Sequence, residues 1–245
     1  EGAGVSRYTD EALWYVDSGG ETHLIARTGD SCPDAPEGHQ FLQLTVPERP
    51  VTDGHGRLAF CGKVAIGGEE RNWRMGVWAG DARDPKRIAY FGEPSPFGGT
   101  VIGGASGLTM DRKGRLFFYD PTPFFDGLQN YGISGAWMFD GERFTQRIAP
   151  GMSTLEGHKI RTVSGPQHRM ANLSGCTLIK GEIVMPKPFP LAVFFVDDEG
   201  IHTVMLNGAR PPGFGPAFSF DLNGSGLVVL SGDGEYGAIK VAVKE

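Results

Sequence analysis

The sequence predicts an all-β protein, most simply a β-propeller of four blades with four antiparallel strands in each blade. Three observations predict this fold class. Glycine and proline are abundant, with 38 Gly and 17 Pro among 245 residues, which is typical of a chain rich in turns. Two short patterns recur four times with a period of about 60 residues. No segment has the apolar spacing of an amphipathic helix, and the best candidate, 153–161, has too few apolar residues.

The first repeated pattern is an Asp or Asn, a Gly three residues later, and apolar residues five and seven positions after the Asp or Asn. An Asx side chain can hydrogen-bond the backbone two residues on, and glycine supplies the positive φ that closes a hairpin. The alternation that follows, as in 57–60, is typical of a strand with one buried face. The predicted turn residues are Asp53 with Gly56, Asp111 with Gly114, Asn172 with Gly175, and Asn223 with Gly226.

The second repeated pattern is an apolar strand, a polar turn and another strand. Its landmark residues are Ile25, Ile88, Ile148 and Met205, at spacings of 63, 60 and 57 residues. It runs in phase with the first pattern, so each repeat reads as strand, Asx–Gly turn, strand, variable loop, strand, polar turn, strand. Four such units with about 60 residues each predict propeller blades.

We therefore expect a single domain over 1–245. Three repeats span about 32–93, 94–152 and 153–209, and 210–245 together with 1–31 form a composite blade. Pairing of the first strands with 217–244 would close the ring and leave no open sheet edge. The strand count exceeds four blades by one, so a partial fifth blade stays open as an alternative.

The residues of the second repeat resemble a known family. Trp78, the run Arg87-Ile88-Ala89 and the run Gly92-Glu93-Pro94-Ser95-Pro96 fit the pattern D/N-x-x-G-x-V/L-x-F … G-I/V-W … L/I-A-x-x-G-D/E-x-x-P. This pattern is similar to that of a tandem-repeat, propeller-like family of bacterial exported proteins, and more distantly to NHL and gluconolactonase-type propellers. The resemblance covers nearly the whole chain, although the third and fourth copies have lost several positions. It implies a fold far more than a chemistry.

Lactonase-type propellers hold a divalent metal in the central channel, and the resemblance therefore implies where such an ion would lie. The corresponding stretches of this chain offer only Glu48, Gln167, His168 and Asp221. The acidic turns at 81–84, 197–199 and 233–235 have no EF-hand pattern, and acidic residues are expected in polar turns. No metal ligands and no cofactor are predicted, while a structural or channel Ca²⁺ stays open.

The most conspicuous loop is 121–134, because it carries Phe124, Phe125 and Tyr131, three aromatic residues that a solvated connection does not need. We expect Trp73 and Phe189 in equivalent loops of the neighbouring blades. Two interpretations stay open. These rings form a contact patch for a partner, or they fold back and cap their own blades.

Composition and charge exclude several classes of function. With a net charge of −6 and no Lys/Arg cluster, binding to nucleic acid or to an anionic membrane face is not expected. The longest apolar run, 191–196, is far shorter than the roughly 20 residues of a membrane-spanning helix. Cys32, Cys61 and Cys176 allow one disulfide or three free thiols. Because the sequence begins at Glu1 rather than Met, we expect an exported protein, periplasmic, extracellular or cell-surface.

No catalytic constellation is predicted, and no G-x-S-x-G elbow occurs. The sequence thus favours a non-catalytic propeller scaffold that binds a protein partner or joins a larger assembly through loops on one face. The alternative is a metal-dependent hydrolase, similar to the lactonases, with a divalent ion in the central channel.

Overall fold

The computed structural model describes residues 11–44, 48–121, 124–126, 129–131, 135–164, 171, 174–185, 191–206, 218–222, 227–232 and 235–240. Every regular element among them is a β-strand, and all strand pairs are antiparallel, which confirms the all-β prediction. Within these residues there is no helix of the length and apolarity needed to cross a membrane.

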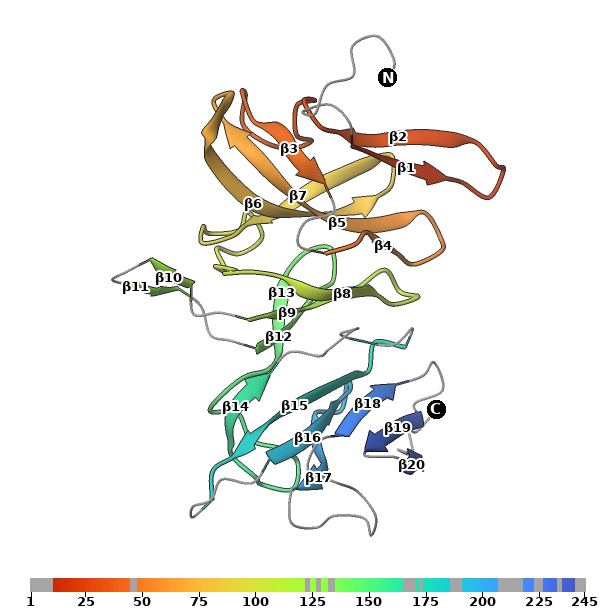
Figure 1. Cartoon of the computed structure of the whole chain (residues 1–245), viewed down its shortest axis with the longest axis vertical. Coiled ribbons are helices and arrows are strands. Elements are labelled where there is room, and N and C mark those ends of the chain that lie inside the picture. The colour runs from red at the N-terminus through yellow and green to blue at the C-terminus, as the bar shows by residue number, and fades with distance from the viewer. Residues whose placement is uncertain are drawn as a thin grey trace.

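Figure 1 shows the strands gathered into sheets that follow one another along the long axis of the molecule. The chain begins with the β1–β2 hairpin, β1 (Ala12–Val16) and β2 (Thr22–Arg27). The β3–β7 sheet has the order β3 (Gln40–Leu44), β5 (Arg57–Ile66), β6 (Glu69–Asp81), β7 (Asp84–Tyr90), and β4 (Val51–Thr52) also pairs with β5. The β8–β13 sheet contains β8 (Ser106–Met110), β9 (Leu116–Asp120), β12 (Gly135–Phe139) and β13 (Phe144–Ile148).

The C-terminal half contains two more sheets. The β14–β17 sheet contains β14 (Ile160–Ser164), β15 (Thr177–Ile183), β16 (Leu191–Val196) and β17 (Ile201–Leu206). The β18–β20 sheet contains β18 (Phe218–Leu222), β19 (Leu227–Gly232) and β20 (Glu235–Lys240). In these sheets the strands follow the sequence order, and the strands of each sheet fall within one of the repeats defined by the two sequence patterns.

Apolar cores lie between successive sheets, which explains why the inner strands are apolar on both faces. All five residues of β9 are buried. Adjacent residues of a strand point to opposite faces. Phe118 therefore packs toward the β3–β7 sheet in a core with Ile88, whereas Phe117 packs in a second core with Phe194 of the β14–β17 sheet. The inner sheets are thus covered on both faces by their neighbours.

The Asx–Gly turns adopt equivalent geometry in two successive sheets. Asp53 Oδ1 accepts hydrogen bonds from the backbone N–H of residues 55 and 57, at 2.7 and 3.1 Å. Asp111 Oδ1 accepts from residues 113 and 115, both at 2.9 Å. Gly56 and Gly114 have φ of +99° and +74°, the positive values expected of turn glycines. Gly175 has φ +79°, whereas Asn172, Asn223 and Gly226 lie outside the described residues.

These turns also contact one another from sheet to sheet. Arg57 lies over the turn of the next sheet, where its Nη1 donates to the carbonyl of Lys113 at 3.3 Å. A β-carbon on Gly114 would lie 2.5 Å from Arg57 Cδ. Arg115 lies in the same way over Gly175, with Asp111 and Phe117 beside it. The glycines therefore serve two purposes, a positive φ and the close approach of a neighbouring side chain.

Ring closure is not observed among the described residues. The β1–β2 hairpin forms a two-stranded sheet of its own, and the β18–β20 sheet has three strands. Figure 1 shows the two at opposite ends of the long axis. What the structure shows is an all-β chain of successive antiparallel sheets, and the closed four-bladed propeller stays a prediction.

Candidate functional site

The aromatic loop 121–134 contains a small hairpin of its own. β10 (Phe124–Asp126) pairs with β11 (Gln129–Tyr131), and the register places Phe124 opposite Tyr131. This hairpin is separate from the β8–β13 sheet, in which β9 pairs directly with β12. Figure 1 shows it standing to one side of the sheets. The side chains of Phe124, Phe125 and Tyr131, like the whole of Phe189, lie outside what the structure describes.

Trp73 lies in a strand, β6, rather than in a loop equivalent to 121–134 as the sequence predicts. The β5 and β6 strands continue to Ile66 and Glu69, which pair directly, and the chain reverses at Gly67 and Gly68 with φ of +65° and +75°. Two central residues of positive φ make a tight hairpin turn. The Trp73 side chain is 46% exposed, and Lys63 Nζ lies 4.5 Å from its ring centroid.

The outer face of the β1–β2 hairpin is a second apolar surface, and the sequence analysis did not single it out. Trp14, Val16 and Leu24 are 56%, 59% and 45% exposed, and Trp14 pairs with Leu24 across the two strands. The alternate residues Leu13, Tyr15 and Ile25 pack against the core of the β3–β7 sheet. The sequence feature that could have indicated this surface is that β1 is apolar at every position, a composition typical of strands covered on both faces.

A second set of Asx turns connects the third and fourth strands of each repeat. Asp17, Asp81, Asp140 and Asp197 each accept backbone N–H bonds through Oδ1 from residues two to four positions later. Asp81 and Asp197 lie in turns that the sequence predicts as polar, but the recurrence of an Asx turn at this place in each repeat was not predicted. Two of the four turns also carry a histidine.

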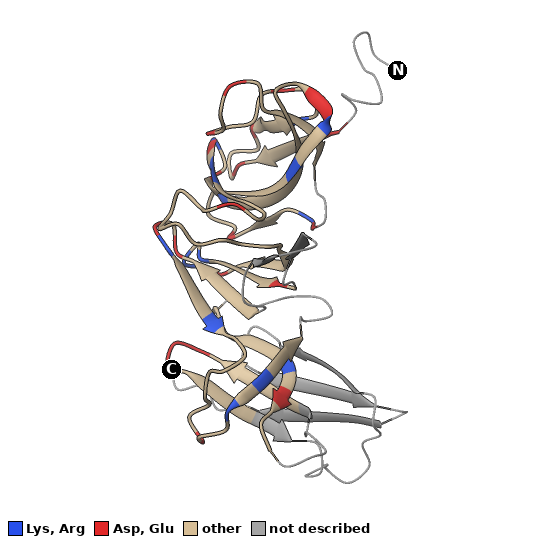
Figure 2. Ribbon diagram, turned by 90° about the vertical axis from the view of Figure 1, so that its left-hand side faces the viewer, with Lys and Arg blue, Asp and Glu red and all other residues tan. Residues whose placement is uncertain are grey.

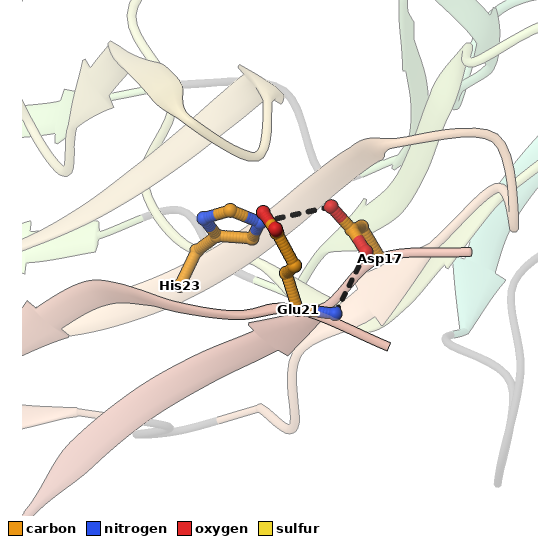
Figure 3. A group of neighbouring side chains, drawn as sticks. All are labelled: Asp17, Glu21 and His23. Carbon is orange, nitrogen blue, oxygen red and sulfur yellow. Dashed lines mark hydrogen bonds and ion pairs between the residues drawn. The ribbon is translucent and has the colours of Figure 1, made fainter. Parts of the chain in front are cut away.

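In the first of these turns, Asp17, Glu21 and His23 approach one another (Figure 3). His23 Nε2 lies 3.0 Å from Asp17 Oδ2, and Arg83 Nη2 lies 3.2 Å from the same oxygen. The hydrogen bond from His23, with two backbone N–H groups, lowers the pKa of Asp17 to about 2. The Asp17 carboxylate therefore already has two side-chain partners, His23 and Arg83.

In the last turn, Asp197, Glu199 and His202 form the corresponding group, with ligand atoms all within 4.8 Å of one another. His202 Nε2 lies 3.5 Å from Asp197 Oδ1, is buried, and has no hydrogen-bond partner among the described residues. On the other ring nitrogen, Nδ1 lies 3.8 Å from Glu156 Oε1. The sequence predicts an acidic turn at 197–199, but nothing in it indicates that His202 and Glu156 lie beside this turn.

Asp198, in the same turn, joins two neighbouring sheets. Its Oδ1 lies 3.2 Å from Arg115 Nη1 and 3.1 Å from Arg147 Nη1. Both arginine side chains are nearly buried, at 13% and 10% exposure, whereas Asp198 is 57% exposed. Figure 2 shows Lys and Arg spread over several sheets beside Asp and Glu, without a basic stripe in the part of the chain that is described.

The structure describes only part of the set of four residues considered for a channel ion. Glu48 is half-buried, Gln167 and His168 lie outside the described residues, and only the backbone of Asp221 is described, in β18.

The sequence left the three cysteines open between disulfide and thiol; in the structure they form no disulfide, and all three are buried. Burial raises the pKa of Cys32 to about 12 and also raises the pKa of Cys61 and of Cys176. Thiols of this kind are structural rather than reactive.

Residues 1–94 match DUF7453, described as a family of unknown function. The DUF7453 match covers the β1–β2 hairpin and the whole β3–β7 sheet and ends shortly after β7. It names no propeller family. No curated protein matches the chain.

Proposed function

We propose that this chain is an exported, non-catalytic binding or assembly module that holds a protein partner through aromatic residues on its long connections. The observation that carries the proposal is the separate β10–β11 hairpin. Because β9 and β12 pair directly, the β8–β13 sheet is complete without the residues between them. An insertion that the sheet does not need, and that contains three aromatic residues, is typical of a binding loop on a rigid β scaffold.

Trp73 supports the same interpretation from a neighbouring sheet. It lies near the tip of the long β5–β6 hairpin, where all six residues from Glu69 to Arg74 are exposed. An exposed indole beside a lysine is an apolar and cationic surface that suits a partner carrying apolar and acidic side chains. Large rigid aromatic side chains supply much of the binding energy in protein interfaces.

The test begins with the partner that co-purifies with the full chain from its native source. Its affinity is then measured with purified components for wild type, for Phe124→Ala/Tyr131→Ala, and for Trp73→Ala. Leu155→Ala is the matched control, because Leu155 is 61% exposed and lies away from both hairpins in sequence. Truncation of aromatic anchors costs about 2 kcal/mol or more, so the double variant should bind roughly 30-fold more weakly.

Melting curves separate the two interpretations of the rings. Weaker binding with an unchanged melting temperature supports a contact patch. A fall in melting temperature with unchanged affinity would mean that the rings cap their own sheets, and it would overturn the proposal.

A further inference from the structure

The turn between β16 and β17 contains an arrangement of donor atoms that the propeller interpretation and the binding function do not use. Asp197 and Glu199 offer carboxylate oxygens and His202 offers an imidazole nitrogen, all within 4.8 Å. We propose that these three residues form a site for a divalent first-row transition metal, with water completing the coordination. One nitrogen and two oxygen donors suit Zn²⁺ and its neighbours in the first row.

The separation of His202 and Asp197 fits two ligands better than a hydrogen-bonded pair. Their Nε2 and Oδ1 atoms are 3.5 Å apart, longer than the usual 2.7–3.2 Å of an N–H···O bond. Two donors at about 2.0–2.2 Å from one Zn²⁺ in tetrahedral geometry are roughly 3.4 Å apart. His202 Nε2 is also buried and has no hydrogen-bond partner among the described residues, a situation that a bound cation would resolve.

A carboxylate also lies near Nδ1, the second ring nitrogen of His202. Glu156 Oε1 lies 3.8 Å from His202 Nδ1, and Glu156 Oε2 accepts a bond from the backbone N–H of Thr203 at 2.9 Å. A metal-binding histidine commonly has a carboxylate at its second nitrogen, which orients the ring and makes it a stronger donor. At 3.8 Å Glu156 does not yet hydrogen-bond His202, and we expect it to move into this positioning role when His202 holds the ion.

The local charge balance also favours a cation. Arg115 and Arg147 are both directed to Asp198, and Arg115 also pairs with Asp111. These two arginines and two aspartates balance one another. Within the described part of the chain, Glu156, Asp197 and Glu199 have no lysine or arginine as an ion-pair partner. Three carboxylates without a lysine or arginine partner therefore gather around one imidazole, an arrangement that favours a bound cation.

The equivalent turn at the other end of the chain provides an internal comparison. There His23 Nε2 is within hydrogen-bond distance of Asp17 Oδ2, at 3.0 Å (Figure 3). Arg83 Nη2 lies 3.2 Å from the same oxygen. A cation would have to displace both groups. We expect the metal to bind at Asp197, Glu199 and His202, and not at Asp17, Glu21 and His23.

The test is calorimetric titration of the full chain, treated with chelator and then dialysed, with Zn²⁺ alone. Wild type should bind one equivalent, and His202→Gln and Glu199→Gln should each weaken the binding at least tenfold. His23→Gln is the matched control and should bind as wild type does. Circular dichroism checks that each variant is folded. If His202→Gln does not fold, Glu199→Gln still tests the site, because Glu199 is exposed and its side chain can change without disturbing a core.

Three results would overturn the assignment. The first is a wild-type chain that takes up no Zn²⁺ at micromolar concentrations. The second is an equivalent of Zn²⁺ that survives both His202→Gln and Glu199→Gln. The third is an equivalent that is lost in His23→Gln, which would place the ion at the N-terminal turn instead.

Discussion

The guanidinium group of Arg115 lies over Gly175, in the space that a β-carbon on this glycine would occupy. Arg115 immediately precedes β9 of one sheet, and Gly175 lies in the turn before β15 of the next sheet. Asp111 Oδ2, which pairs with Arg115 Nε at 2.7 Å, lies against the same position. One contact therefore joins the ion pair of one repeat to the turn of the following repeat.

We expect Gly175→Ala to destabilise the protein by about 2–4 kcal/mol, because it combines an unfavourable positive φ with overpacking against buried groups. Gly54→Ala is the matched control. Gly54 has a nearly equal φ, +78° against +79°, but nothing lies within 4 Å of its β-carbon position. Gly54→Ala should therefore lower the free energy of unfolding by only about 1 kcal/mol. Chemical denaturation measures both, and equal losses would mean that the inter-sheet contact contributes nothing.

We expect Asp198→Asn to destabilise the fold by about 1–2 kcal/mol at pH 7, because Arg115 and Arg147 would lose their shared charged partner. The figure is below that of a buried pair, since Asp198 itself is more than half exposed. Glu142→Gln, an exposed carboxylate outside this contact, is the control. Urea denaturation in low salt measures the loss, and an unchanged midpoint would contradict the prediction.

The same carboxylate should make stability depend on pH. Burial alone would raise the pKa of Asp198, but the attraction of Arg115 and Arg147 outweighs burial and lowers it. A carboxyl with a lower pKa in the folded state contributes fully above its unfolded pKa, about 3.9, and loses this contribution as pH falls through the folded pKa. Wild type should therefore lose more stability than Asp198→Asn between pH 5 and pH 2. Parallel pH profiles of the two proteins would rule this out.

Deletion of 1–28 should cause aggregation and lower the melting temperature by several degrees. It removes the β1–β2 hairpin and uncovers the core that contains Phe41, Phe60 and Trp78. Deletion of 1–10 leaves the hairpin in place and is the control. Light scattering and thermal melting compare the two truncations. A monomeric 29–245 chain with an unchanged melting temperature would show that the hairpin does not protect this core.

The three cysteines should resist a thiol reagent in the folded protein. Each side chain is buried, and the raised pKa of Cys32, about 12, leaves almost no thiolate at pH 8. Titration with an aromatic disulfide should detect close to none of the three thiols in buffer and all three in guanidinium chloride. Fewer than three under denaturing conditions without reductant would indicate a disulfide.

The strand order and the Asx–Gly turns could be predicted from the sequence because their causes are local. An Asp that bonds the backbone two residues on, and a Gly at positive φ, specify a turn wherever they occur, as at Asp111 and Gly114. The Gly67-Gly68 pair contained the same information, but Trp73 was assigned to a loop because the two-residue hairpin was not recognised. For the candidate metal site, Asp197 and Glu199 are close in sequence, whereas Glu156 is distant and reaches His202 only through the fold.

The sequence by itself thus determined that the chain is all-β, that its strands form repeated antiparallel units, and where the turns at Gly56, Gly114 and Gly175 fall. The tertiary structure decided which apolar surfaces remain exposed to solvent. Trp14 and Phe118 are both aromatic residues in apolar strands, yet one is 56% exposed and the other is buried. The difference is only that a further sheet covers β9 on each face, while the outer face of β1 has none among the described residues. Burial depends on which neighbours a strand acquires, and no local pattern of side chains specifies those neighbours.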